Sequence, residues 1–309
     1  MIRINPILRN EMKTDSRRFR FYLLLMLYVV LIGLPVLIFY HVVSKAYRID
    51  ASSFSGMYVF LACMQAVILM FIAPALTANA ITSEREKQTL DILLTTQMTP
   101  RSIIWGKLLA AISKVILLII CVMPIYAVVL FLGGIRLSHI IGINLYLMAT
   151  TVCVGALCIW ISTVVKTSKF ANVAAYFMEL GFIVGVPVVV CICFALNMNR
   201  YDGKAVEEMM KVIMHIICVS PAVGYGHLIG GQLFGGNIMD YMYMFDVSGK
   251  MIVPGWVISI GVEVVLTILF MELAVRGLNP LKKPSKIRGL FGKRKNKKAK
   301  KSKEEVVSP

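Results

Sequence analysis

Long apolar runs separated by shorter polar stretches dominate the chain. Six runs of 23–27 residues contain few charged side chains, at positions 21–43, 57–79, 108–132, 140–165, 170–196 and 251–275. The hydrocarbon core of a bilayer is about 30 Å thick, and an α-helix needs about 20 residues to cross it. The pattern therefore predicts an all-α polytopic membrane protein with six transmembrane helices.

A charged, amphipathic stretch lies between the second and third runs, at 79–107. Ser83 and Glu86 have the spacing of a capping box, which predicts a helix that begins there and continues over 84–96. Thr99 followed by Pro100 predicts the cap and first residue of a second helix that enters the third span. On the first helix, one face is polar (Glu84, Lys87, Gln88, Asp91, Thr95) and the other apolar (Leu90, Leu93, Leu94, Met98).

The segment 197–250, between the fifth and sixth runs, is long and less apolar. Residues at helical spacing predict a short helix over 204–219, which Ser220 and Pro221 end. Six glycines between Gly224 and Gly236 interrupt the moderately apolar stretch that follows. We expect a pair of short helices that lie on or dip into the outer leaflet. A seventh span within 205–240 is the alternative, although Pro221 and the glycines would break it.

Composition and charge placement give the topology. Of the 309 residues, 58% are hydrophobic and the mean hydropathy is +0.78, which excludes an ordinary soluble domain. The flanks on the side of both termini carry 25 Lys and Arg, whereas those on the opposite side carry seven. The positive-inside rule then places both termini and the loop 81–107 in the cytosol, and we expect the protein in the cell membrane.

The two basic ends flank the six-span domain at 21–275. Residues 1–20 predict a cytosolic amphipathic interface helix, or a solvated positive terminus that only fixes orientation. Residues 276–309, rich in Lys, Pro and Gly, predict a disordered cytosolic tail whose basic cluster suits anionic lipid head groups, with a topology signal or a solvated tail as the alternative. Nucleic acid is not an expected partner, because the tail offers only Phe291 for base stacking.

The sequence lacks the usual signatures of catalysis. It has no G-x-x-x-x-G-K-[ST] motif, and the run GLFGK at 289–293 lies in the basic tail without a preceding strand. The seven cysteines lie in apolar surroundings without CxxC spacing, and the four histidines are scattered. We therefore expect a chain that is not an enzyme and holds no cofactor or metal.

Two acidic residues lie deep in the predicted spans. Glu179 and Glu263 are about 14 and 18 Å from the inner ends of the fifth and sixth spans, at 1.5 Å per residue. A charge at this depth is costly and usually faces protein or a water-filled path. Both are candidates for lining a substrate pathway or pairing across the bundle, and a buried structural hydrogen bond is the alternative. Glu272 is shallower and has Arg276 one turn away as a partner.

One run of the sequence has a specific resemblance. It reads A-x-x-x-x-A-I-x-x-E-R-E-x-x-T-L-x-x-L-L-x-T, and a G-K-L follows at the entry to the third span. The matching residues are Ala75, Ala80, Ile81, Glu84, Arg85, Glu86, Thr89, Leu90, Leu93, Leu94, Thr96, Gly106, Lys107 and Leu108. This run resembles the permease subunits of ABC-2-type ABC transporters.

The resemblance implies that the loop is a coupling helix, which docks on a separate P-loop ATPase subunit that binds ATP and Mg. The docking residues would be Glu84, Arg85, Glu86, Lys87, Thr89, Leu90, Leu93 and Leu94. It also implies re-entrant helices before the last span, a second permease copy or homologue, and a pathway around the second and fifth spans. Export is favoured, because members of the family mostly export.

We therefore expect a permease subunit of an ATP-driven exporter. A channel or scaffold without an ATPase partner is the alternative, and its function would survive charge reversal at Glu84 and Glu86. The apolar spans leave the substrate open among lipid, peptide, drug, polysaccharide and ion. They also leave homodimer and heterodimer open.

Overall fold

The computed structural model describes residues 13, 19–45, 51–90, 92, 99–132, 135–197, 213, 216–234 and 254–278. The chain divides after Gly277 into two compact units, and the helix bundle lies in the first. Three predicted segments fall largely outside the described residues: the interface helix at 1–20, the tail at 276–309 and much of the outer segment at 197–250.

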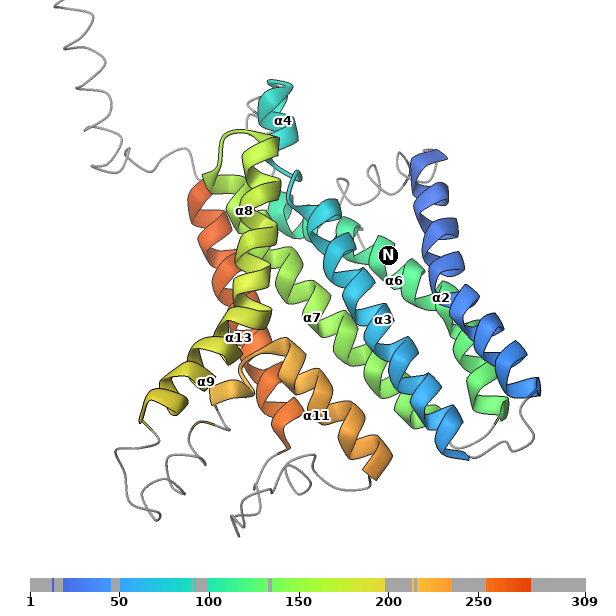
Figure 1. Ribbon diagram of the computed structural model, residues 1–309. Coiled ribbons are helices and arrows are strands. Elements are labelled where there is room, and N and C mark those ends of the chain that lie inside the picture. Colours follow the sequence, from blue (N-terminus) through green and yellow to red (C-terminus); the bar gives the residue numbers. More distant parts are fainter. Residues whose placement is uncertain are drawn as a thin grey trace, which may run out of the picture. The chain divides into compact units, whose positions relative to one another are not determined.

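Helices make up all the regular structure of the described residues, so the all-α prediction is confirmed (Figure 1). Six of these helical stretches are long and apolar enough to cross a membrane. They comprise α2 (Phe19–Lys45), α3 (Ala51–Thr77), α6 (Pro100–Leu132), α7 (Leu137–Val164), the broken span α8 (Ser168–Leu180) with α9 (Val186–Asn197), and α13 (Gly255–Leu278).

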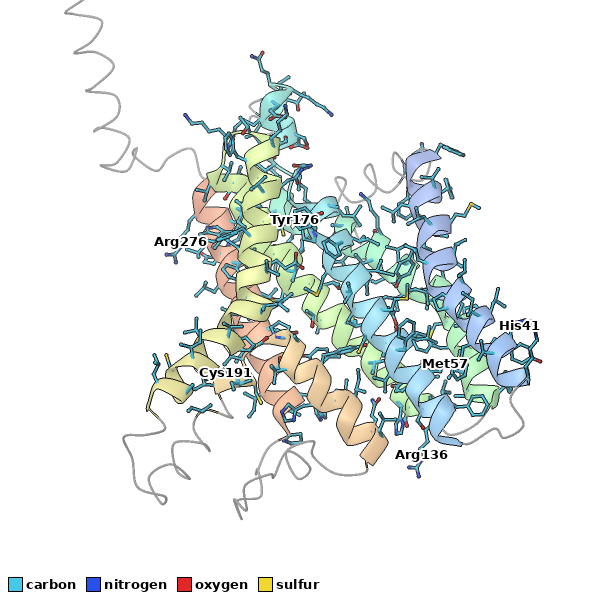
Figure 2. All side chains as sticks on the ribbon, in the orientation of Figure 1. His41, Met57, Arg136, Tyr176, Cys191 and Arg276 are labelled. Carbon is cyan, nitrogen blue, oxygen red and sulfur yellow. The ribbon has the colours of Figure 1, made fainter. Side chains whose placement is uncertain are left out.

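The helices alternate in direction, as a six-span topology requires. Arg276 lies at the end of the bundle that carries the short helix α4 (Thr82–Glu86), whereas His41, Met57 and Arg136 lie at the opposite end (Figure 2). At the first end, α6 begins at Pro100, and the Ser102 N–H donates to Thr99 Oγ1 at 3.3 Å. The prediction of a Thr99 cap before Pro100 is therefore confirmed.

Helix α7 is the centre of the bundle. It packs against α3, α6, α8 and α11 (Pro221–Phe234), and 67% of its span is buried, against 11% for the fifth span and 17% for α2. Its buried side combines small and polar residues such as Gly155, Ala156 and Asn144 with larger apolar ones. The outer helices expose large apolar side chains, as a lipid-facing surface does.

The fifth span is broken in the middle. The α-helix α8 passes into a π-helical turn, η1 (Gly181–Gly185), before α9 continues with Pro187 as its second residue. Proline removes a backbone donor and clashes with the preceding turn, and a π turn is one way to absorb that defect. In Figure 1, α9 turns away from the line of α8. The other span prolines, Pro35, Pro74 and Pro124, lie inside α2, α3 and α6.

Helix α11 is one of the short helices predicted before the last span. Its 14 residues extend about 21 Å at 1.5 Å per residue, so within the described residues this helix is shorter than a membrane span. Contrary to expectation, it stays helical through its glycines. Tertiary hydrogen bonds hold it: Tyr146 Oη donates to Pro221 O at 2.9 Å, Tyr225 Oη to Ala62 O at 3.0 Å, and Ser220 Oγ to Ile183 O at 2.6 Å.

Two glycines of α11 differ in their surroundings and provide a matched test. A Cβ at Gly224 would collide with Ser259 of α13 and with the Tyr146 hydroxyl, whereas a Cβ at Gly226 would meet no atom within 4 Å. We expect Gly224→Ala to destabilise the protein by about 1–3 kcal/mol through overpacking. Gly226→Ala should be neutral or stabilising by up to about 1 kcal/mol, because alanine favours helix.

The measurement is the thermal unfolding midpoint of each purified variant in detergent. If Gly224→Ala unfolds at the wild-type temperature, the close approach of α11 to α13 does not exist.

Candidate functional site

The first candidate site is the loop that contains α4. The predicted Ser83 cap is wrong. Helix α4 begins at Thr82, and its N-cap residue, Ile81, makes no side-chain hydrogen bond to the helix N-terminus. Instead, the backbone N–H groups of Ile81 and Thr82 both donate to Ser162 Oγ of α7 at 3.0 Å. Ser162 is fully buried, so it supplies from a distant helix the acceptor that a helix N-terminus needs.

Helix α4 is also shorter than predicted. It ends at Glu86, and Gln88 adopts a left-handed backbone conformation with φ of 57°. This conformation excludes the predicted continuous helix over 84–96. The Thr89 N–H then donates to Glu84 O at 3.0 Å, and Leu90 turns inward and is 7% exposed. This geometry is typical of a helix C-terminus. Leu93 and Leu94 lie outside the described residues.

Arg85 closes the end of a neighbouring helix. Its guanidinium donates to Val165 O at 2.6 Å and to Thr163 O at 3.0 Å, at the C-terminal end of α7. The last carbonyls of a helix have no partner within the helix and carry partial negative charge, so a cation there is favourable.

Glu86 caps α8, the helix that follows α7. Its carboxylate accepts hydrogen bonds from the backbone N–H and the hydroxyl of Ser168, both at 2.7 Å. Ser168 is the first residue of α8, whose own N-terminal residue Thr167 makes no side-chain cap. An acidic side chain at a helix N-terminus is stabilised by the helix dipole.

Glu84 connects the loop to a third helix. Its Oε1 lies 2.6 Å from Lys107 Nζ of α6, and the Lys107 side chain is 4% exposed. We call this set of contacts the loop clasp, and define it by Glu84, Arg85, Glu86, Lys107, Ser162 and Ser168. The clasp ties α4 to α6, α7 and α8 at once.

The predicted docking residues therefore separate into two groups. Glu84, Arg85 and Glu86 bond to the chain's own helices, and Leu90 is buried. Lys87 and Thr89 are exposed, together with Gln88 between them. Sequence reasoning missed Ser162 and Ser168, because a serine at a span end has no distinguishing pattern.

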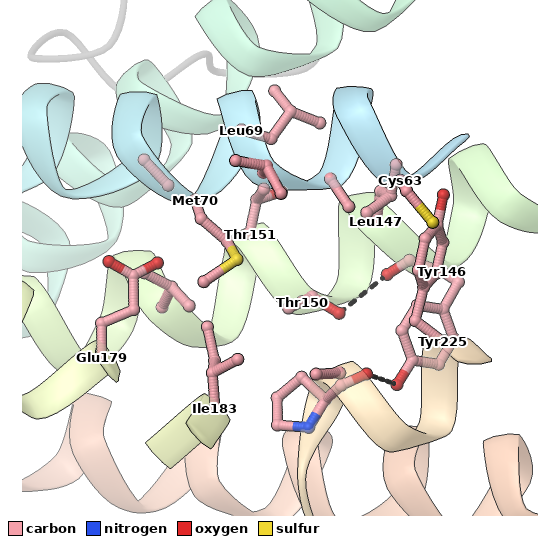
Figure 3. A pocket seen from close by; sticks show the side chains of 16 residues that line it. Cys63, Leu69, Met70, Tyr146, Leu147, Thr150, Thr151, Glu179, Ile183 and Tyr225 are labelled. Carbon is pink, nitrogen blue, oxygen red and sulfur yellow. Dashed lines mark hydrogen bonds between the residues drawn. The ribbon is translucent and has the colours of Figure 1, made fainter. Parts of the chain in front are cut away.

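The second candidate site is a partly open cavity of about 230 Å³ between helices of the bundle (Figure 3). Its walls come from α3, α7, α8, η1 and the start of α11. The Glu179 carboxylate lies at one end of it and the rings of Tyr146 and Tyr225 lie at the other, with Met70, Thr150 and Thr151 between. The remaining lining residues are apolar or Cys63. Glu179 is 3% exposed, and its Oε1 has no hydrogen-bond partner among the described residues.

Glu263 of α13, the other predicted carboxylate, contacts α7 at Thr150, a residue that also lines the Glu179 cavity. Its Oε1 accepts a hydrogen bond from Thr150 Oγ1 at 3.0 Å, while Oε2 is buried without a partner among the described residues. Glu263 borders a separate cavity of about 420 Å³ with Trp105, Met148 and Thr267. The two carboxylates thus line different cavities.

The predicted ion pair between Glu272 and Arg276 is present, and a second arginine also pairs with Glu272. Arg276 Nε lies 3.3 Å from Glu272 Oε1, as the spacing predicts, and Arg101 of α6 adds a second contact at 3.2 Å to Oε2. The Arg101 pair ties α6 to α13, whereas the Arg276 pair lies within α13. Within the described residues, no group of three or more His, Cys, Asp or Glu is arranged to hold a metal ion. The seven cysteines are all free thiols.

Comparison with known proteins gives a family. Residues 5–278 match the family model for the ABC-2 family transporter protein. A search of curated proteins gave no match. Because the family match covers nearly all of the six-helix bundle, the chain belongs to the ABC-2 family of transporter proteins and is a membrane permease of an ABC transporter.

Proposed function

We propose that this permease belongs to an exporter in which a separate P-loop ATPase docks on the exposed turn of the α4 loop. The observation that carries the proposal is that Lys87, Gln88 and Thr89 are exposed on a loop that the clasp holds against three helices. A polar surface on a rigid support suits a docking partner, because little conformational freedom is lost on binding.

In this arrangement the loop 81–107 and both termini lie in the cytosol of the cell, and the protein spans the cell membrane. ATP and Mg are bound by the partner, since the sequence contains no P-loop. The basic tail at 276–309 lies next to anionic lipid head groups.

The clasp suggests how motion of the ATPase reaches the spans. The chain itself leads from the loop into α6 at Pro100. Arg85 and Glu86 also bond to the junction of α7 and α8, and Glu84 bonds to α6. A displacement of α4 would therefore move three helices together, as in rigid-body switching transitions.

Assembly with a second permease would cover the most exposed span. Only 11% of the fifth span is buried, and Phe170, Val173 and Phe177 of α8 are exposed. The second and fifth spans also form walls of the Glu179 cavity. Both features support a dimer, of identical or homologous chains, with its pathway beside these spans.

The docking proposal predicts a selective effect of charge reversal. Lys87→Glu should abolish co-purification of a P-loop ATPase with the tagged permease from its native membrane, while Lys45→Glu at the opposite end should not. Both residues are exposed, so neither change should alter folding beyond about 0.5 kcal/mol. The measurement is the amount of ATPase recovered per permease.

Two results would count against the proposal. If wild type brings down an ATPase and Lys87→Glu does so equally, the docking surface lies elsewhere. If wild type is recovered without an ATPase under conditions that preserve other membrane complexes, the result favours the channel or scaffold alternative.

The coupling route predicts a separate effect at Ser162. Ser162→Ala leaves two buried N–H groups without their acceptor, at a cost of about 1–3 kcal/mol each. The ATPase should still bind, but ATP should change hydrogen exchange at the start of α8 less than in wild type. Ser113→Ala is the control, because Ser113 bonds only to Ala110 O in its own helix. An unchanged response in Ser162→Ala would show that the Ser162 contact does not carry the motion from α4 to α8.

A further inference from the structure

We propose that the Glu179 cavity binds a lipophilic amine, with the Glu179 carboxylate as its counter-ion and the apolar walls around its hydrocarbon body. This inference rests on the proposed function and deepens it, because it names a substrate class that the apolar spans left open.

The polar groups of the cavity wall are satisfied, with one exception. Thr150 donates to Glu263 at 3.0 Å, and Thr151 Oγ1 donates to Met148 O at 2.9 Å. Tyr146 bonds to Pro221 O and Ser259 Oγ, and Tyr225 to Ala62 O. Among these wall oxygens, only Glu179 Oε1 is buried without a partner in the described part of the chain. A ligand of this cavity therefore needs one polar group at one end.

The charge of that group follows from the lining. None of the 16 residues that line the cavity is Lys, Arg or His, so no cation of the wall neutralises Glu179. An unpaired carboxylate in an apolar site is costly, and a cation that enters the site offsets this cost. An anion would meet the opposite electrostatic field. The lining thus selects a cation.

The size of the ligand body follows from the volume. An engineered apolar cavity of about 150 Å³ holds benzene, so the cavity of about 230 Å³ has room for a single ring with a short alkyl chain. Met70 and Ile183 beside Glu179, and the tyrosine rings at the far end, provide apolar and aromatic contacts for such a body (Figure 3).

Binding of 4-phenylbutylamine to the full chain in lipid nanodiscs tests the proposal. We expect saturable binding by calorimetry, and at least about tenfold weaker binding to Glu179→Gln, because a hydrogen bond to a charged group contributes about 1.5–3 kcal/mol. The uncharged 4-phenylbutan-1-ol should bind weakly to both proteins. Glu272→Gln is the control: it removes a carboxylate of α13 that pairs with Arg101 and Arg276, neither of which lines this cavity, and should keep affinity within about twofold of wild type.

A second variant keeps the carboxylate and removes space. Ala66 lines the cavity, and Ala66→Leu should also weaken amine binding while leaving Glu179 in place. It decides the question if Glu179→Gln does not purify as a folded protein. Equal binding of amine and alcohol, or wild-type affinity in the cavity variants, would overturn the proposal.

This assay needs no ATPase. Amine binding without a co-purifying ATPase would support the site and contradict the proposed transporter, whereas a co-purifying ATPase without amine binding would do the reverse.

Discussion

Backbone groups at helix ends must find hydrogen-bond partners, and at the α4 end of this bundle they find them on other helices. Ser162 accepts from the start of α4, Arg85 donates to the end of α7, and Glu86 accepts from the start of α8. The N-cap residues of α4 and α8, Ile81 and Thr167, make no side-chain cap of their own. The position of the α4 loop therefore depends on where α7 and α8 meet. The exposed turn at 87–89 follows α4 directly, so the same contacts fix its position.

The spans were predictable because bilayer thickness fixes the length of a membrane-spanning helix, and a helix of that length is a continuous run of apolar residues in the sequence. The start of α6 was predictable because its cap, Thr99, directly precedes Pro100. The cap of α4 was not, since Ser162 is some 80 positions away and looks like any other serine in an apolar run. The persistence of α11 through its glycines had the same cause: Tyr146 of α7 bonds to its first residue, and its own Tyr225 bonds to Ala62 of α3.

The candidate site was predictable in part for the same physical reason. Depth in a span singled out Glu179 and Glu263, and both are buried with an oxygen that lacks a partner among the described residues. Which way each faces depends on how the helices rotate about their axes, which hydropathy does not record. The structure places α7 between their two cavities, so that Thr150 contributes to one wall and bonds to the carboxylate of the other.

The π turn in the fifth span has a mechanical consequence. A uniform α-helix transmits a push along its whole length, but η1 divides this span into two rods with a compliant joint at mid-height. Glu86 of the α4 loop accepts a hydrogen bond from the start of α8. Ser220, directly before α11, donates a hydrogen bond to Ile183 O in the π turn. A displacement of the loop would then tilt α8, the half that carries Glu179, about the π turn, and α9 need not follow.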